Sequence, residues 1–224
     1  MSSLAQQVTA AGLADHILSE RQLANLLGGG DARRYGLVNR ALKDGSLLRV
    51  KRGIYLLGKH YRSAPAHPFA ITQGLVPGSY VSFESALAHH GWIPEAVFVT
   101  ASVTPGRKTL RFDTTDFGAF SFHPLAIADY HFLAGVDRVQ MGKLAAFVAQ
   151  PLRALLDLVA LSKEPWAGIE WLTHGMRIDE DMLLGLRRRD FAKLKPVYKH
   201  KAVNSFLAAL ESAVMARKDP SAND

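Results

Sequence analysis

The stretch DARRYGLVNRALKDGSLLRVKRGIYLL, residues 31–57, decides the fold of the N-terminal part of this 224-residue chain. Its first half predicts a helix over residues 32–43, capped by Asp31 and ended by Asp44-Gly45. On a helical wheel of about 100° per residue, three apolar side chains gather on one side, which we expect to face the core: Tyr35, Val38 and Leu42. The opposite side is mostly basic and polar, with Arg34 and Asn39 at its flanks, and consists of Arg33, Gly36, Leu37, Arg40 and Lys43.

A second helix is predicted just upstream, over residues 20–27. Ser19 and Gln22 have the spacing of a capping box, in which each side chain bonds the other residue's backbone. The run Gly28-Gly29-Gly30 ends this helix, because glycine loses the most conformational freedom when it is held in a helix. Two short helices joined by a tight turn are therefore expected before the hairpin.

The second half of the stretch predicts a hairpin, from the β-prone runs 47–50 and 54–57 around the turn Lys51-Arg52-Gly53. Helix, turn, basic helix and basic hairpin in this order indicate a winged helix-turn-helix. We expect the basic helix to read a DNA major groove, and Arg49, Lys51 and Arg52 to lie against phosphates or the minor groove. The alternative is a winged helix that serves only as a protein-interaction module.

The positive charge is concentrated at the two ends of the chain. The net charge of +7 divides into +5 for residues 1–60, −3 for 61–186 and +5 for 187–224. A polyanion is the partner that such a distribution favours. The C-terminal cluster is either a solvated basic face or a second nucleic-acid surface, formed by Arg187, Arg188, Arg189, Lys193 and Lys195 and continuing to Lys199 and Lys201.

Composition narrows the class of protein. The chain has no cysteine, which excludes disulfides and thiolate zinc sites and suits a reducing cytoplasm. Residues 1–8 lack the charged and apolar segments of a secretory signal, and no apolar run approaches the roughly 20 residues of a membrane span. We expect a cytoplasmic protein without a membrane partner, a metal or a cofactor.

The middle of the chain predicts a different architecture. We divide the chain into a DNA-binding domain (1–60), a linker (61–68) rich in proline and small residues, an α+β domain (69–217) and a disordered tail (218–224). The α+β domain is expected to hold a small sheet with strands near 80–81, 97–103, 110–114 and 117–122, a helix over 83–90 capped by Ser82, and only helices after the last strand.

Three stretches, taken in order and spacing, resemble the AbiEi antitoxins of type IV (AbiE, abortive-infection) toxin–antitoxin systems. They are residues 48–55 (LRVKRGIY), 80–95 (YVSFESALAHHGWIPE) and 151–158 (PLRALLDL), and the turn 103–107 (VTPGR) also fits. Leu152-Arg153 departs from the family, which tends to carry an acidic–basic pair there. The resemblance extends from about Leu18 to about Leu210.

The resemblance implies an antitoxin that also represses its own promoter. Its implied partners are double-stranded DNA and a nucleotidyltransferase-like toxin, counteracted with or without direct contact. A stand-alone winged-helix regulator with a ligand-sensing C-terminal domain is the alternative. We do not expect an enzyme, since Glu84, Asp113, Asp116 and Lys108 lack the spacing of a nuclease site, and His89-His90 suits a helix end better than a metal.

Overall fold

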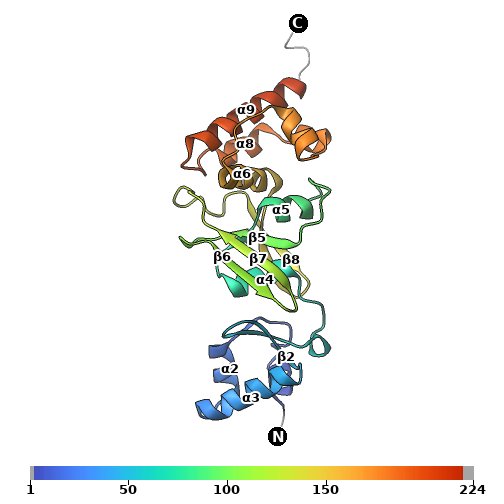
Figure 1. Cartoon of the computed structure of the whole chain (residues 1–224), viewed down its shortest axis with the longest axis vertical. Helices are drawn as coiled ribbons and strands as arrows, with labels where there is room; N and C mark the ends of the chain where they lie inside the picture. The colour runs from blue at the N-terminus through green and yellow to red at the C-terminus, as the bar shows by residue number, and fades with distance from the viewer. Residues whose placement is uncertain (1–2, 219–224) are drawn as a thin grey trace. The chain divides into compact units, whose positions relative to one another are not determined.

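The computed structural model describes residues 3–218 and shows an α+β protein. The chain divides into two compact units (Figure 1). The first comprises residues 1–78, 112–119 and 138–146, and the second comprises 79–111, 120–137 and 147–224. The first unit thus takes in the tips of two hairpins whose strands belong to the larger sheet.

Three helices open the first unit: α1 (Leu4–Ala10), α2 (Glu20–Leu27) and α3 (Asp31–Lys43). The capping box predicted at Ser19 is confirmed, with the Gln22 amide donating to Ser19 Oγ at 3.2 Å. Helix α1 was not predicted, although Ser3 and Gln6 repeat the same spacing and form the same box. Asp31 was wrongly predicted to cap α3. Gly30 is the cap residue and Asp31 begins the helix.

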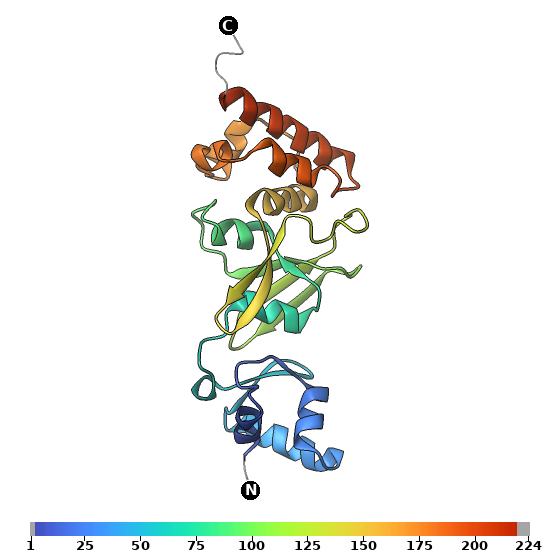
Figure 2. The same ribbon diagram turned by 180° about the vertical axis from the view of Figure 1, so that it is seen from behind.

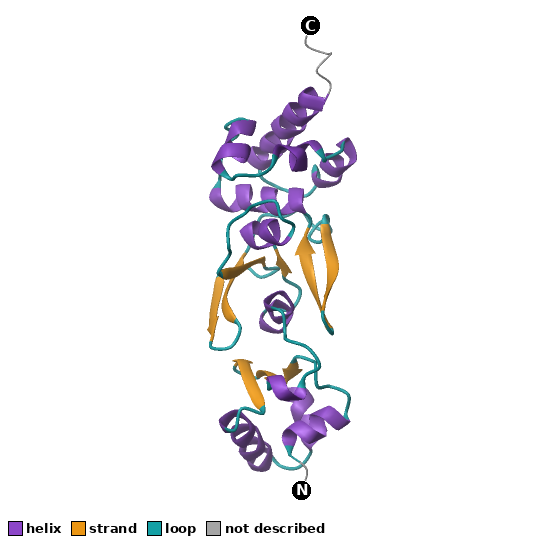
Figure 3. Ribbon diagram, turned by 90° about the vertical axis from the view of Figure 1, so that its right-hand side faces the viewer, coloured by secondary structure: helices purple, strands orange, loops and turns teal. Residues whose placement is uncertain are grey.

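A small antiparallel sheet completes this part of the first unit, in the order β1-β3-β2. The predicted hairpin is confirmed as β2 (Leu47–Lys51) and β3 (Ile54–Leu57), and β1 (Leu18–Ser19) pairs with β3. A register shift between Arg49 and Lys51 and the positive φ of 79° at Gly53 turn the chain at the hairpin tip. Figure 3 shows these strands in orange beside the purple helices.

The core beneath α3 differs from the prediction at two residues, Tyr35 and Leu37. Tyr35 is 72% exposed, whereas Ala41 is buried and Leu37, Val38 and Leu42 pack against the cluster formed by α1, α2 and the hairpin. On the wheel, the inward direction therefore passes between Leu37 and Val38 and leaves Tyr35 on a flank. The predicted inward face was wrong for Tyr35, and the predicted DNA-facing place of Leu37 was wrong as well. Both errors arose because an aromatic residue was counted as core from its hydrophobicity alone.

Part of the predicted linker has regular structure. The first residue of the linker, Tyr61, ends the 3₁₀ turn η1 (Lys59–Tyr61). The last residue of the linker, Pro68, begins α4 (Pro68–Leu75). Proline suits this first helical position, since it lacks the amide hydrogen that would have no partner there. The His67 ring caps the helix, with Nδ1 accepting from the Phe69 amide at 3.2 Å.

The larger sheet is mixed, with the order β6-β7-β5-β4-β9-β8. Its strands are β4 (Tyr80–Val81), β5 (Val99–Val103), β6 (Leu110–Thr114), β7 (Gly118–His123), β8 (Val136–Met141) and β9 (Leu144–Ala149). Strand β4 pairs antiparallel with β5 and parallel with β9. The prediction of helices alone after residue 122 was wrong, because β8 and β9 form a hairpin around Gly142, where φ is 65°.

Helices make up the rest of the second unit: α5 (Phe83–His89), α6 (Pro151–Ser162), the π-helical turn η2 (Trp171–Gly175), α7 (Glu180–Leu184), α8 (Arg188–Leu194) and α9 (Lys201–Lys218). Helix α6 packs against α5, α8 and α9 (Figure 2). Lys218 ends α9 rather than beginning a tail, and residues 219–224 lie outside the described residues. Between residues 3 and 218, no helix has the length and apolar composition needed to cross a membrane.

A buried polar network holds the centre of the second unit. Arg153 and Asp157, one turn apart on α6, are both fully buried and pair at 3.0 Å between Nε and Oδ1. Asp157 also accepts hydrogen bonds from Tyr198 at 2.7 Å, Ser82 at 2.7 Å and Tyr80 at 3.0 Å. Because its two oxygens have four donors, the carboxylate is satisfied without water.

The arginine of this network is equally well bonded. Its Nη1 and Nη2 donate to the Ala134 carbonyl and the Tyr80 hydroxyl, and its guanidinium carbon lies 5.0 Å and 5.4 Å from the ring centroids of Tyr80 and Tyr198. Burial raises the pKa of both tyrosines well above the ordinary value. Ser82 is the N-cap residue of α5, as predicted, but its hydroxyl bonds Asp157 rather than the first turn of the helix.

Candidate nucleic-acid interface

The outward face of α3 is basic and polar. Opposite the inward residues Leu37, Val38 and Ala41, the wheel places Gly36 and Lys43 at the centre of the outer face, with Asn39 and Arg40 beside them. Both cations are exposed, and Asn39 is half-buried. This face of α3 therefore offers two positive charges and one amide that can pair with a base edge.

Gly36 leaves part of the helix backbone uncovered on the outer face of α3. An added Cβ at this position would meet no heavy atom within 4 Å. Glycine inside a helix costs about 1 kcal/mol relative to alanine, and packing within the described chain gives no reason for it here. A bare backbone in the middle of an exposed helical face allows a close approach by a partner surface.

One flank of α3 borders a hollow shared with α2 and the hairpin. We call it the α3–hairpin hollow, and its volume is about 590 Å³. Leu23, Leu27, Val38 and Tyr55 are among its apolar lining residues, and its polar and aromatic lining residues are Glu20, Asp31, Arg34, Tyr35, Asn39, Arg49 and Arg52. The hairpin cations Arg49 and Arg52, which are exposed, thus lie on the Asn39 side of α3.

Two of the predicted contact residues, Arg33 and Arg34, are engaged within the α2–α3 turn. Arg33 Nη1 donates to the carbonyl of Leu27 at 2.8 Å and to that of Gly28 at 3.3 Å. Arg34 donates to the Gly29 carbonyl and pairs with Asp31. Carbonyls at a helix C-terminus lack partners within the helix and favour nearby cations. Both arginines therefore stabilise the turn between the two helices.

Lys51 is the third predicted DNA contact whose side chain bonds within the protein. It belongs to the hairpin, but its hydrogen bond is to a residue outside the hairpin. Its ammonium donates to the carbonyl of Leu75 at the end of α4 and lies 5.5 Å from the centroid of the Phe112 ring. Partial burial lowers the pKa of this lysine from its ordinary value. Arg33 is also exposed but is engaged in the α2–α3 turn, so the exposed cations left to the outer face and hairpin are fewer than the sequence indicated: Arg40, Lys43, Arg49 and Arg52.

The C-terminal basic cluster runs along α8, from Arg187 at its N-cap to Lys195 at its C-cap. The side chains of Arg187, Arg188, Arg189, Lys193 and Lys195 are exposed. Several have polar neighbours: Lys195 pairs with Glu211 at 2.9 Å, and Lys193 donates to Gln150 at 3.3 Å. Its use as a second nucleic-acid surface stays a prediction.

The residues weighed for catalysis or metal binding do not assemble. Within residues 3–218, no group of three or more histidine or acidic side chains is placed to hold a metal ion. His90 bonds the Ala149 carbonyl through Nε2 at 2.9 Å, and Glu84 lies in the first turn of α5, as predicted. Asp113 belongs to β6 and Asp116 to the turn that follows it, apart from Glu84 in sequence and element.

Comparison with known proteins gives a fold relationship. No family model matches the chain, and no curated protein sequence matches it. The crystal structure of the RV2827C protein from Mycobacterium tuberculosis is similar, with a TM-score of 0.57 and 15% sequence identity over 94% of this chain and 77% of that one. At this identity the similarity concerns the fold alone.

Proposed function

We propose that residues 3–57 form a winged helix-turn-helix that binds double-stranded DNA, and that the protein represses its own promoter. The observation that carries the proposal is the outer face of α3, where a glycine with open space beyond it lies among exposed cations, while one flank of the same helix borders the basic hairpin. A recognition helix needs such a face, since its backbone has to enter the major groove while its side chains reach base edges.

In this proposal the contacts divide by element. On α3, Asn39 and Arg40 lie on the face that enters the groove, where asparagine pairs with adenine and arginine with guanine. On the hairpin, Arg49 and Arg52 contact phosphates or the minor groove, which positions the protein without reading sequence. Arg33, Arg34 and Lys51 act indirectly, by fixing the α2–α3 turn and the hairpin.

We further propose that the protein is an antitoxin, with a cytoplasmic site of action. This part rests on the resemblance of residues 48–55, 80–95 and 151–158 to the AbiEi antitoxins. The last two stretches supply Tyr80, Ser82, Arg153 and Asp157, which bond one another in the buried network. Because Arg153 is fully buried, a surface role in neutralisation falls to other residues of the second unit.

DNA binding is tested by fluorescence anisotropy with the full chain and the DNA upstream of its own gene. Replacing Arg52 by alanine should weaken binding to all sequences alike and lower the slope of log affinity on log salt by about one. Arg138→Ala, which removes one exposed cation from β8, is the matched control for net charge. Equal weakening by both variants would refute a specific role of the hairpin.

The antitoxin role is tested by growth. The adjacent reading frame is expressed alone, and then with the full chain. Arrest by the neighbour and rescue by this protein support the proposal, and rescue by an Arg40→Ala/Arg52→Ala variant would show that it does not depend on DNA binding. If the neighbour is harmless, or its toxicity is unaffected, the protein is a stand-alone regulator.

A further inference from the structure

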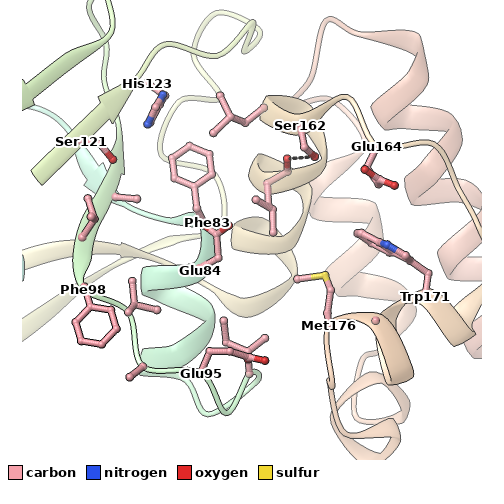
Figure 4. Close-up of a pocket in the computed structure, with 18 residues that line it drawn as sticks. Phe83, Glu84, Glu95, Phe98, Ser121, His123, Ser162, Glu164, Trp171 and Met176 are labelled. Atoms are coloured by element: carbon pink, nitrogen blue, oxygen red, sulfur yellow. Dashed lines mark hydrogen bonds between the residues drawn. The ribbon is translucent and has the colours of Figure 1, made fainter.

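The second unit contains a groove that neither DNA binding nor the buried network uses. Its volume is about 720 Å³, within the usual range of roughly 300–1,000 Å³ for small-molecule sites. It is formed by α5, the α5–β5 loop, β7, the end of α6 and η2 (Figure 4). We call it the α5–η2 groove.

The lining of this groove combines aromatic rings with carboxylates. Phe83, Phe98 and Trp171 supply the rings, and Phe98 is 87% exposed. The acidic residues are Glu84, Glu95 and Glu164, and no lysine or arginine lines the groove. Figure 4 shows these side chains coming from opposite walls, with Phe98 and Glu95 on the loop and Glu164 and Trp171 across from them.

Two of the three carboxylates have no cationic partner in the described chain. Glu95 pairs with Arg177 at the Nε atom, 2.8 Å away, whereas Glu84 and Glu164 form no ion pair among residues 3–218. The one histidine of the groove, His123, has its pKa lowered by burial, against the opposing effect of Glu84. The groove is thus negatively charged at neutral pH.

Hydrogen bonds fasten one wall of the groove, formed by α5 and β5. Ser85 Oγ donates to the Val99 carbonyl at 3.0 Å and accepts from the Ala101 amide at 2.9 Å, which fastens α5 to β5. Phe83, which is buried, has a φ of 54°, in the left-handed region that a non-glycine residue enters at a cost of about 1–3 kcal/mol. The bond from the neighbouring Ser82 to Asp157 holds the chain at this position.

Rings and carboxylates together are the chemistry that recognises an organic cation. The face of an aromatic ring attracts an ammonium group, and an unpaired carboxylate in a partly apolar site adds a stronger and longer-ranged attraction. A neutral ligand would gain no such attraction from Glu84 and Glu164, and an anionic ligand would be repelled by them. Strained backbone, in turn, concentrates at ligand sites, where the surrounding structure maintains it.

We propose that the α5–η2 groove is a binding site for a small hydrophobic amine, whose apolar part contacts Phe98 and Trp171 and whose ammonium lies between Glu84 and Glu164. This site is independent of the proposed DNA contacts. It gives the second unit a ligand-binding role of its own.

The test is isothermal titration of the full chain with three probes of one shape: 4-phenylbutylamine, 4-phenylbutan-1-ol and 4-phenylbutanoate. We expect the amine to bind about ten-fold more tightly than the alcohol and the carboxylate to bind least, because only the charge differs among them. Equal affinities, or no binding of the amine at millimolar concentration, would overturn the proposal.

Variants locate the site. Glu84→Gln and Glu164→Gln should each weaken the amine about five-fold and leave the alcohol unchanged, whereas Glu180→Gln, a carboxylate on α7 paired with Arg217, should change neither. Phe98→Leu keeps an apolar side chain at an exposed position, so that the fold is not at risk, and should weaken the amine about three-fold. If Glu84→Gln, Glu164→Gln and Phe98→Leu all left binding of the amine intact, the amine would bind elsewhere and the assignment would be refuted.

Discussion

The outer face of α3 and the α5–η2 groove are two candidate binding surfaces of opposite charge in one chain. The α3 face is cationic and open, with a glycine at its centre, and suits a large, regular polyanion. The groove is acidic and lined by aromatic rings, and suits a small cation. The segmental charges of +5 for residues 1–60 and −3 for 61–186 already reflect this contrast. Net charge of the whole chain, by comparison, describes neither surface.

The two surfaces also differ in what supports them, and the largest expected effect concerns the support of the groove. Asp157→Ala leaves Arg153 buried without its carboxylate and frees the donors of three hydroxyls. Removing one member of a buried pair typically costs about 3–5 kcal/mol of unfolding free energy. Urea unfolding followed by tryptophan fluorescence reports on this unit, since Trp92, Trp166 and Trp171 all belong to it.

Asp129→Ala is the matched control within the same unit, because it removes a carboxylate from an exposed pair with Lys199. Its effect should stay below about 1 kcal/mol. If Asp157→Ala were as mild as this control, the network would not be what stabilises the second unit.

The next effect separates two arginines of α3 that the sequence alone treats alike. Arg40→Ala should cost about 1–3 kcal/mol of binding free energy at the operator and relax specificity at one base pair. Arg34→Ala should lower the stability of the first unit more than its affinity, because Arg34 bonds the Gly29 carbonyl and Asp31. Anisotropy and thermal unfolding on both variants give the answer, and the reverse pattern would contradict the assignment of the outer face.

A smaller effect sharpens the role of Gly36. Gly36→Ala should raise the unfolding free energy by about 0.5–1 kcal/mol, since alanine is the better helix former and the added Cβ meets open space. The same substitution should lower DNA affinity, because a methyl group then lies between the backbone and the groove. A gain in stability with unchanged affinity would move the DNA contacts away from the centre of α3.

The smallest effect is a pH dependence outside both surfaces, at His67. Its Nδ1 accepts from the Phe69 amide and has to be unprotonated to do so, and burial lowers the pKa of the ring. A base with a depressed folded-state pKa contributes stability above its unfolded pKa of about 6.5, and this contribution is lost as the pH falls through the folded-state pKa. Stability should therefore decline between pH 7 and pH 5.

His67→Asn keeps a capping acceptor that does not titrate in this range. Thermal unfolding of this variant across the same interval should show a flatter pH profile than the wild type does. An unchanged profile would assign the pH dependence to other groups.

Much of the first unit was predictable because its signals are local. The Ser19–Gln22 box, the three glycines and the turn at Gly53 each act within a few residues, and the hairpin lies where the pattern placed it. Helix α1 carried the same kind of signal at Ser3 and Gln6 and was overlooked. Four of the candidate DNA contacts are exposed, as a contact residue has to be: Arg40, Lys43, Arg49 and Arg52.

The sequence by itself thus determined the α2–turn–α3–hairpin order, the distribution of charge and the absence of thiol chemistry. Only the tertiary structure decided which side of α3 faces inward, since Tyr35 and Leu37 exchange their expected places once α1 and the hairpin are packed. It also decided that Arg33, Arg34 and Lys51 bond carbonyls, and that Tyr80, Ser82, Arg153, Asp157 and Tyr198 meet in one network. For Lys51 and for the bonds that Tyr80 and Ser82 form with Asp157, the physical reason is sequence separation: a hydrogen bond between residues as far apart as Ser82 and Asp157, 75 positions, leaves no periodic trace in the chain. Arg33 and Arg34 bond carbonyls five or six residues away, and there the conformation of the α2–α3 turn decides.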